Sequence, residues 1–262
     1  MTTVMQRVRG AARVEIGPRG LIDLGQRGSA KAMMPRVDAA EPEVVFLNTA
    51  GGITGDDRLD YALDLRAGAR ATGATQTAER AYRAGGGTGR VGTRLSIGAG
   101  GRLDWLPQEM ILYQGADIAR VTEVDLAADA AFLGVDSVVL GRAAHGETVT
   151  AARLDDRRTI RRGGHLLHEE HVALDAAALA HPATMAGARA FATILFTAPG
   201  CADALGPLRE ALGDDGAASA WDGRLVARMV HPTAQTLRRA LIRAIVALRR
   251  APMPRVWQDD SP

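Results

Sequence analysis

Alternating apolar and polar residues dominate the first two-thirds of the chain. The clearest case is RLDYALDLR, residues 58–66, whose apolar positions are Leu59, Tyr61, Leu63 and Leu65. A period of two predicts a strand with one buried face and one face in water. Residues 94–107, RLSIGAGGRLDWLP, read as strand, glycine turn and strand, and residues 121–142 follow the same scheme. We therefore expect a β-rich region over residues 10–180.

The strand–turn–strand segments also resemble one another. Their turns, near Gly68, Gly100 and Asp129, recur about every 30 residues. A repeat at this spacing predicts stacked β units that share one continuous core. Ordinary hairpins of an all-β protein have the same local pattern and are the alternative. The predicted fold class is mainly β, a stacked, β-helix-like domain.

The pattern changes near residue 180. Residues 201–213 look helical, with Pro207 either opening or kinking the helix, and Asp222-Gly223 predicts a hairpin turn. In residues 232–250 Pro232 suits a first helical turn. The apolar stripe of this second helix is Leu237, Leu241, Ile245 and Leu248. We expect one domain over 1–262, with a mixed α/β part over residues 185–257 that contains two short helices.

Arginines crowd toward the predicted exposed side of the last helix. They are Arg238, Arg239, Arg243, Arg249 and Arg250. The two interpretations are a solvated face and a partner-binding face. We take Arg238, Arg239, Arg243 and the later Trp257 as candidate partner contacts.

Composition excludes several classes of function. The chain has 262 residues, a formal net charge of +2 and 4% aromatic residues, which gives no nucleic-acid footprint. No apolar run approaches the roughly 20 residues that span a bilayer. A single cysteine, Cys201, permits no internal disulfide and no cysteine-rich metal site. We expect a cytoplasmic protein without a secretory signal.

The glycine-rich segment LNTAGGITGDDRL, residues 47–59, matches no ligand-binding template. It contains neither phosphate-loop motif, and a strand follows where a helix should begin. Asp56 and Asp57 lack the alternating ligands and the closing glutamate of a calcium loop. A glycine turn that ends in carboxylates remains.

The segment HLLHEEH contains His165, His168 and His171, one residue short of a zinc-protease motif. On a strand His165 and His171 share one face, while His168 takes the other. Glu169 and Glu170 likewise point to opposite faces. A small metal-dependent hydrolase that uses His165 or His171 with Glu170 is an alternative function. We predict no catalytic residue, because no nucleophile motif is present.

Carboxylates stand among apolar strand residues at several places. They are Asp57, Glu109, Asp136, Glu147 and Glu170. A buried carboxylate is costly unless it is paired, hydrogen-bonded, bound to metal or next to water.

Four motifs carry a family resemblance. FLNTAGGITGDDRL, LDWLPQEMILYQGA, VVLGRAAHGE and PRVW occur in the order and spacing of UreD-type urease accessory proteins, also called UreH. The resemblance covers the chain from residue 10 to Trp257. It implies a β-rich, helix-like stack of strands and a non-enzymatic scaffold for maturation of the nickel enzyme urease. The implied partners, in a hetero-oligomer, are apo-urease, a UreF-type protein and, through it, a UreG-type GTPase.

The same resemblance implies an internal tunnel for transient Ni²⁺, with no tightly bound cofactor. By motif position the nickel path falls on Asp57, Asp136 and Glu170, with Glu109 and Glu147 as weaker candidates. The sequence departs from the family where Gly55-Asp56-Asp57 replaces Gly-Gly-Asp, and again at Glu79-Arg80. An interaction module that never meets metal is a further alternative.

Overall fold

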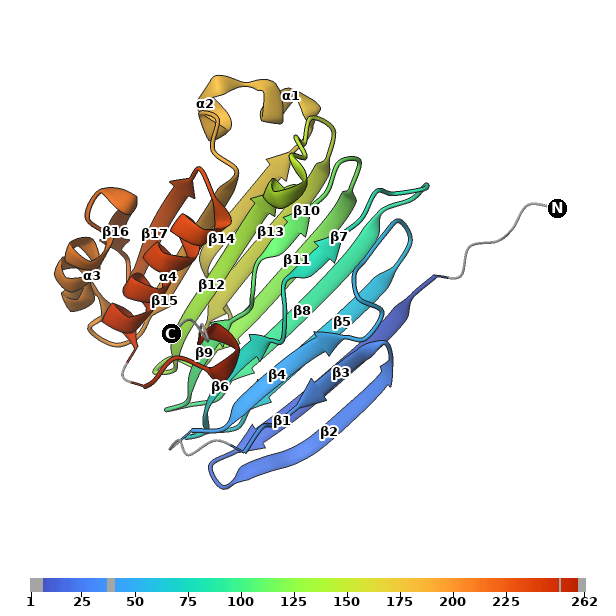
Figure 1. The fold of residues 1–262 in the computed structure, drawn as a ribbon. Coiled ribbons are helices and arrows are strands. Elements are labelled where there is room, and N and C mark those ends of the chain that lie inside the picture. Colours follow the sequence, from blue (N-terminus) through green and yellow to red (C-terminus); the bar gives the residue numbers. More distant parts are fainter. Residues whose placement is uncertain (1–6, 37–40, 250, 259–262) are drawn as a thin grey trace.

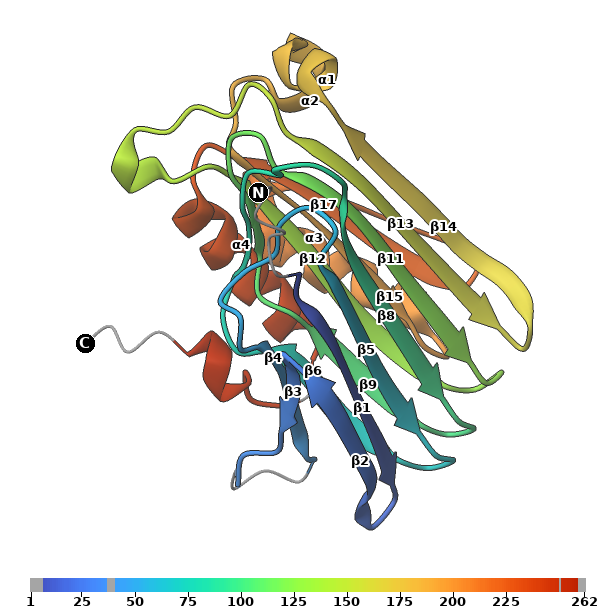
Figure 2. The same cartoon turned by 90° about the vertical axis from the view of Figure 1, so that its right-hand side faces the viewer.

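Two β-sheets lie face to face in the described part of the chain, as the two views in Figures 1 and 2 show. The computed structural model describes residues 7–36, 41–249 and 251–258. The first sheet contains, in spatial order, β14 (His165–Leu174), β13 (Arg153–Arg162), β11 (Asp117–Leu126), β8 (Gly89–Ile97), β5 (Arg58–Leu65), β1 (Arg9–Gly17) and β2 (Gly20–Gly28).

The second sheet has the same stacking direction and is interrupted in its middle. Its order is β16 (Ala217–Trp221), β17 (Arg224–His231), β15 (Ala190–Thr197), β12 (Ala131–Leu140), β9 (Arg102–Leu106), β6 (Arg70–Thr75), β4 (Glu43–Asn48) and β3 (Ala30–Met33). Two short strands, β10 (Met110–Leu112) and β7 (Glu79–Ala81), continue β9 and β6 beyond the interruption, and β10 pairs in parallel with both β12 and β7.

Between β5 and β12 the chain alternates between the two sheets, which confirms the stacked β units. The chain passes from β5 to β6, from β8 to β9 and from β11 to β12, each time from the first sheet to the second. Equivalent strands pair in parallel, so that Leu63 lies beside Leu95 and Leu95 beside Val124. The turns stack as well, since the Gly100 amide donates to the Asp129 carboxylate at 2.9 Å. The glycine turns are therefore arcs between sheets, and the hairpin alternative is wrong for them.

The core fills the space between the sheets. Leu59 and Leu63 on one sheet and Phe46 and Leu103 on the other are fully buried. Burial of such a side chain contributes roughly 2–3 kcal/mol. Because each repeat places its apolar face on the same side, these residues form continuous rows along the stack.

Short helices occupy the C-terminal part. They are α1 (Ala176–Ala180), α2 (Pro182–Met185), α3 (Leu205–Leu212) and α4 (Ala234–Leu248), with 3₁₀ turns η1 (Ala143–His145), η2 (Cys201–Ala204), η3 (Gly213–Asp215) and η4 (Arg255–Trp257). The two predicted helices are α3 and α4, which share a second core with β15 and β17. Pro207 lies in the first turn of α3, and Asp222-Gly223 forms the expected β16–β17 turn with positive φ at both residues.

Two details of the last helix differ from the prediction. Pro232 precedes α4 instead of lying in its first turn, because the helix begins at Ala234 and Thr233 caps it: the Thr233 hydroxyl accepts from the Thr236 amide at 3.1 Å. Arg249 is buried instead of exposed: its guanidinium donates to Thr72 at 3.0 Å and lies 3.6 Å from the Asp104 carboxylate. A buried acid on β9 thus draws it inward, whereas helical periodicity pointed it to solvent. Arg250 lies outside the described residues.

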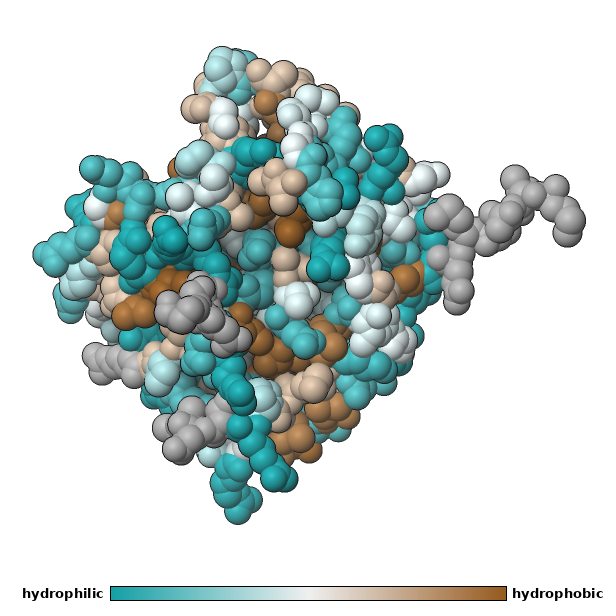
Figure 3. All heavy atoms as spheres, in the orientation of Figure 1, coloured by the Kyte–Doolittle hydropathy of each residue, from teal (hydrophilic) through white to brown (hydrophobic). Residues whose placement is uncertain are grey.

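The surface is mostly hydrophilic with separate hydrophobic areas. Figure 3 shows brown side chains near the middle and the lower edge of the face seen in Figure 1. Large exposed hydrophobic side chains include Trp221 on β16, Val230 on β17 and Val246 on α4. Within the described ranges, the helices are all too short or too polar to cross a membrane.

Candidate functional site

A cavity of about 100 Å³ lies between the two sheets. It has room for several water molecules, since one water needs roughly 10–15 Å³. Its apolar wall includes Val91, Trp105 and Phe132. Its polar wall consists of Tyr61, Thr75, Glu79, Thr93, Gln108, Arg120, Thr122, Asp136, Arg158, His168, Glu170 and Thr193.

Inward-facing positions change from apolar to charged along the stack. One row across the first sheet runs Tyr61, Thr93, Thr122, Arg158 and Glu170, each paired in register with the next. The neighbouring row runs Leu59, Val91, Arg120 and Asp156. The interior is therefore polar at its β13–β14 end. At the other end the second row is apolar, with Leu59 on β5 and Val91 on β8.

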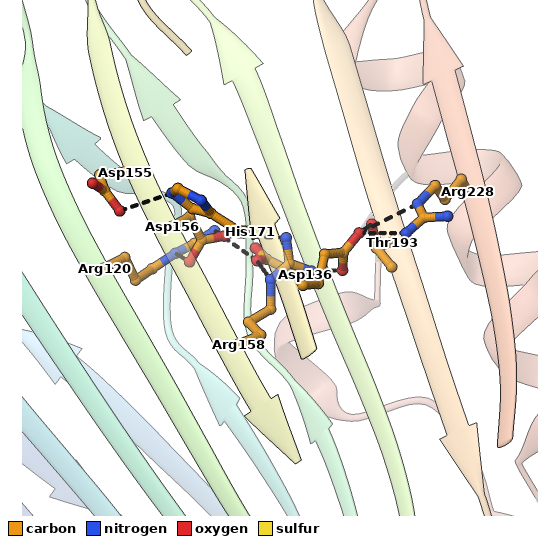
Figure 4. Close-up of polar contacts among 9 residues, drawn as sticks. Arg120, Asp136, Asp155, Asp156, Arg158, His171, Thr193 and Arg228 are labelled. Carbon is orange, nitrogen blue, oxygen red and sulfur yellow. Dashed lines mark hydrogen bonds and ion pairs between the residues drawn. The ribbon is translucent and has the colours of Figure 1, made fainter. Parts of the chain in front are cut away.

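Arg120 and Arg158 hold two aspartates together at this end (Figure 4). Arg120 Nη2 lies 2.6 Å from Asp136 Oδ2 and 2.7 Å from Asp156 Oδ2. Arg158 lies 3.2 Å from the same Asp136 oxygen and 3.1 Å from Asp156. The four side chains are at most 13% exposed, so the ion pairs are shielded from water.

Glu170 joins this cluster to the second sheet. Arg158 Nη1 lies 3.2 Å from Glu170 Oε2, and Arg228 Nη2 lies 2.9 Å from Glu170 Oε1. The Thr193 hydroxyl donates to the same Oε1 at 3.4 Å. The Arg228 side chain is 60% exposed, so this end of the cluster reaches the surface between β14 and β17.

The cluster balances its charges. Arg120, Arg158 and Arg228 face Asp136, Asp156 and Glu170. Burial raises the pKa of Asp136, and the two arginines only partly offset it. Burial also acts on Asp156, but the ion pairs with Arg120 and Arg158 outweigh it and lower the pKa of Asp156. The shared arginines therefore favour charge on Asp156 over Asp136, which holds its proton more readily.

The opposite end of the cavity meets the interruption in the second sheet. Strand β6 stops at Thr75 and resumes as β7 at Glu79, while β9 stops at Leu106 and resumes as β10 at Met110. A second cavity of about 90 Å³ adjoins here, and Tyr61, Thr75 and Glu79 line both. Burial raises the pKa of Glu79 to about 7, although Asn48 donates to its carboxylate at 3.2 Å.

His168 also faces the cavity, next to Glu170 on the inward side of β14. It is 8% exposed, and burial lowers its pKa. Its Nε2 atom finds no hydrogen-bond partner among the described residues. A neutral imidazole can bind a metal ion through its unprotonated ring nitrogen, so His168 adds a potential metal ligand beside the carboxylates.

The structure places Asp57 apart from these residues. Its carboxylate accepts from the amides of Val8 at 2.7 Å and Thr54 at 2.8 Å, and the residue is 3% exposed. It closes the glycine turn and is not among the described residues that line the cavity between the sheets. A Cβ on Gly55 would lie 2.0 Å from the Gly86 carbonyl, so close backbone approach does require that glycine.

The neighbouring Asp56 is the residue at which this sequence departs from the family's Gly-Gly-Asp pattern. Its φ is +64°, in the left-handed region that favours glycine. Its carboxylate lies 3.9 Å from Arg7 with 59% of the side chain exposed. The position therefore demands an unusual backbone conformation, and the extra acid faces solvent.

Glu109 and Glu147 lie outside the cavity wall formed by the described residues. Glu147 accepts from Arg142 at 2.8 Å, and this hydrogen bond lowers its pKa to about 2. The Glu109 main-chain oxygen accepts from the Glu79 amide at 3.0 Å. Both residues hold loops in place, and their predicted link to metal stays a prediction.

The candidate partner residues divide into buried and exposed side chains. Trp257 is 2% exposed, donates to the Leu106 carbonyl at 2.8 Å and packs under Arg238. Arg238 also donates to Gln108 at 2.7 Å, which joins the C-terminal segment to the cavity wall. Arg243 pairs with Asp215, and Arg239 is exposed. Their contact with a partner stays a prediction, and Arg239 and Arg243 are the two exposed residues among them.

The histidine and glutamate of the hydrolase alternative do not converge. His171 faces outward, 3.1 Å from Asp155, while Glu170 faces the cavity. A bulge at Leu167 interrupts the alternation of inward and outward side chains along β14, and His165 pairs opposite Arg162. His165 and His171 therefore lie on different faces of the strand, and the prediction that they share one is wrong. Within the described ranges, no group of three or more His, Cys, Asp and Glu side chains is placed to hold a metal ion.

Sequence reasoning missed Arg120, Asp156, Arg158 and Glu79 as parts of the site. A signal was present for Arg120 and Asp156, because both occupy positions where the earlier repeats carry Leu59 and Val91. This signal depends on the exact register between the repeats, which the spacing of the turns alone does not give.

Fold and site together define a β-stacked protein whose interior carries a polar, acid-containing cavity. Comparison with known proteins then gives the family. Residues 7–258 match the UreD urease accessory protein family. A urease accessory protein UreD from Paracoccus denitrificans (strain Pd 1222) is 51% identical over 260 residues, covering 97% of this chain and 93% of that protein.

Two other relatives agree. The urease accessory protein UreD of Dinoroseobacter shibae is 52% identical over 262 residues, covering 97% of this chain and 93% of that protein. The one from Jannaschia sp. (strain CCS1) is 51% identical over 261 residues, covering 98% of both. The chain belongs to the UreD family of urease accessory proteins.

Proposed function

We propose that this protein is a urease maturation factor that conducts Ni²⁺ through its interior to apo-urease. The observation that carries the proposal is the cavity between the sheets, which is lined by two of the three acids on the implied nickel path, Asp136 and Glu170. Carboxylates and water are ligands that accept Ni²⁺. A wall of such groups also raises the local concentration of a cation.

The arginines give this path its weak affinity. Asp136 and Glu170 are each held by two guanidinium groups. A cation that binds either acid must compete with these ion pairs. Competition lowers the residence time of the metal, as a path that delivers its cargo requires. Because Arg228 is largely exposed, a partner that binds it would leave Glu170 with one guanidinium, Arg158, for the cation to compete with.

The protein partners follow from the family. We propose that the chain joins apo-urease, a UreF-type protein and, through the latter, a UreG-type GTPase. Arg239 and the exposed Val246 on α4 support a binding role for the outer side of this helix.

Urease activation in cells that lack the native protein tests the path. Asp136→Asn and Glu170→Gln keep the size of the side chain and avoid a cavity around the buried arginines. Glu169→Gln, on the outward face of the same strand, is the matched control. We expect lost activation in the first two variants, normal activation in the third, and retained urease and UreF-type partner in pull-downs of all three.

Asp57→Asn is measured in the same assay, because Asp57 belongs to the implied nickel path but lies in the glycine turn, apart from the cavity. Normal activation with Asp136→Asn and Glu170→Gln together would contradict nickel passage along these acids. That result would favour an interaction module that never meets metal.

A further inference from the structure

We propose that Glu79 is a binding residue for a hydrated divalent cation at the junction of the two cavities. The carboxylate stands where β6 and β9 are both interrupted, and it lines the cavity on each side together with Tyr61 and Thr75. Any cation that moves between the cavities passes within reach of this side chain. The inference rests on the proposed function only for the identity of the cation.

Glu79 differs from the other acids of the cavity in its partners. Asp136 and Glu170 are occupied by arginines. The Glu79 carboxylate accepts a hydrogen bond from the Asn48 side-chain amide, and the main chain and charge of Arg80 also favour its ionised form. Among the described residues no guanidinium forms an ion pair with Glu79, so its charge is only partly compensated, and oxygen positions of the carboxylate remain open to a metal.

The surroundings supply further oxygen atoms. The hydroxyl-bearing residues Tyr61 and Thr75 line both cavities next to Glu79, and the Asn48 side chain touches it. One carboxylate with hydroxyl, carbonyl and water ligands suits hard or borderline divalent cations at low affinity. The exposed residues Gln76, Thr77 and Arg80 line the second cavity. Glu79 thus lies between a surface opening and the charged interior.

Its protonation agrees with this role. Burial raises the pKa of Glu79 to about 7, so about half of the empty sites hold a proton at neutral pH. A cation that binds there replaces the proton and compensates the buried charge. The neighbouring ionisable groups are Tyr61 on β5 and Arg80 on β7.

Equilibrium dialysis of the full-length protein with Ni²⁺ at pH 8 tests the site. The variants are Glu79→Gln, which keeps the Asn48 hydrogen bond, and Glu79→Asp, which keeps the charge. Glu169→Gln is the control, because Glu169 is exposed on the outward face of β14 and is not among the residues that line the cavity. We expect about a tenfold weaker affinity for Glu79→Gln, partial recovery for Glu79→Asp and no change for Glu169→Gln.

A second readout locates the metal. Mn²⁺, a paramagnetic probe, should broaden the side-chain amide signal of Asn48 in the wild type and in Glu170→Gln, but not in Glu79→Gln. Unchanged Ni²⁺ affinity and unchanged Asn48 broadening in Glu79→Gln would overturn the inference, whatever the activation assay gives. Failure of the proposed function appears separately, as normal urease activation in the Asp136 and Glu170 variants.

Discussion

The raised pKa of Glu79 makes the stability of the metal-free protein depend on pH. Burial raises this pKa to about 7 from the 4.5 of an exposed glutamate. The folded state therefore binds the proton more tightly than the unfolded state. The resulting stabilisation is fully present below pH 4.5 and is lost as pH rises through 7. Since one pKa unit corresponds to about 1.4 kcal/mol, full ionisation costs at most about 3 kcal/mol.

Glu79→Gln removes this titration while keeping the hydrogen bond from Asn48. We expect the variant to match the wild type in unfolding free energy near pH 5, apart from a constant offset. The variant should then gain about 2–3 kcal/mol relative to the wild type by pH 8. Urea denaturation in the presence of a chelator, at pH 5, 6.5 and 8, measures the difference. The exposed Glu169→Gln is the control.

Parallel pH profiles for wild type and Glu79→Gln would refute the reasoning. They would mean that water reaches the Glu79 carboxylate freely and that it ionises at its ordinary pH. A difference that grows toward acid pH would show that the partners of the ionised form, Asn48 and Arg80, outweigh the effect of burial.

Three further changes test the fold and the loop. Arg249→Met removes one partner of the buried Asp104 carboxylate. Urea denaturation should show a loss of about 3–5 kcal/mol in the unfolding free energy, whereas the exposed Arg239→Met should leave it unchanged. Asp56→Gly relieves a left-handed residue and should raise the unfolding free energy by about 0.5–1 kcal/mol; a loss would indicate that the contact with Arg7 matters more. Leu63→Ala empties a fully buried position between the sheets and should lower the thermal midpoint through a loss of about 3–5 kcal/mol; a loss below 1 kcal/mol would contradict tight packing there.

Individual strands and helices could be predicted from the sequence, because they depend on the pattern of neighbouring residues along the chain. The period of two at Leu59–Leu65 gave β5, and the apolar stripe of α4 gave its buried face. The spacing of the turns at Gly68, Gly100 and Asp129 indicated stacked units. Only the structure separated stacking from simple hairpins, since both have the same pattern along the chain.

The site was only partly accessible. Asp136 and Glu170 were found through the family resemblance, and both line the cavity. Glu79 was taken as a departure from the family, yet it occupies the junction between two cavities. Asp57 was grouped with the cavity acids, but it hydrogen-bonds within its own loop. A carboxylate looks the same in sequence whether water, an arginine or a backbone amide surrounds it.

The sequence by itself determined the β-rich stack, the two larger helices and the family of the protein, because periodicity and ordered motifs survive without tertiary information. Tertiary structure decided which side chains meet. Arg158 and Glu170 lie on adjacent strands, whereas Arg228 reaches Glu170 from the other sheet, 58 residues further along the chain. Such contacts depend on register between strands, and a shift by one residue would turn every side chain to the opposite face. Burial and ion pairing then shift the pKa values of Asp136, Asp156 and Glu79, so the chemistry of the cavity depends on the folded arrangement.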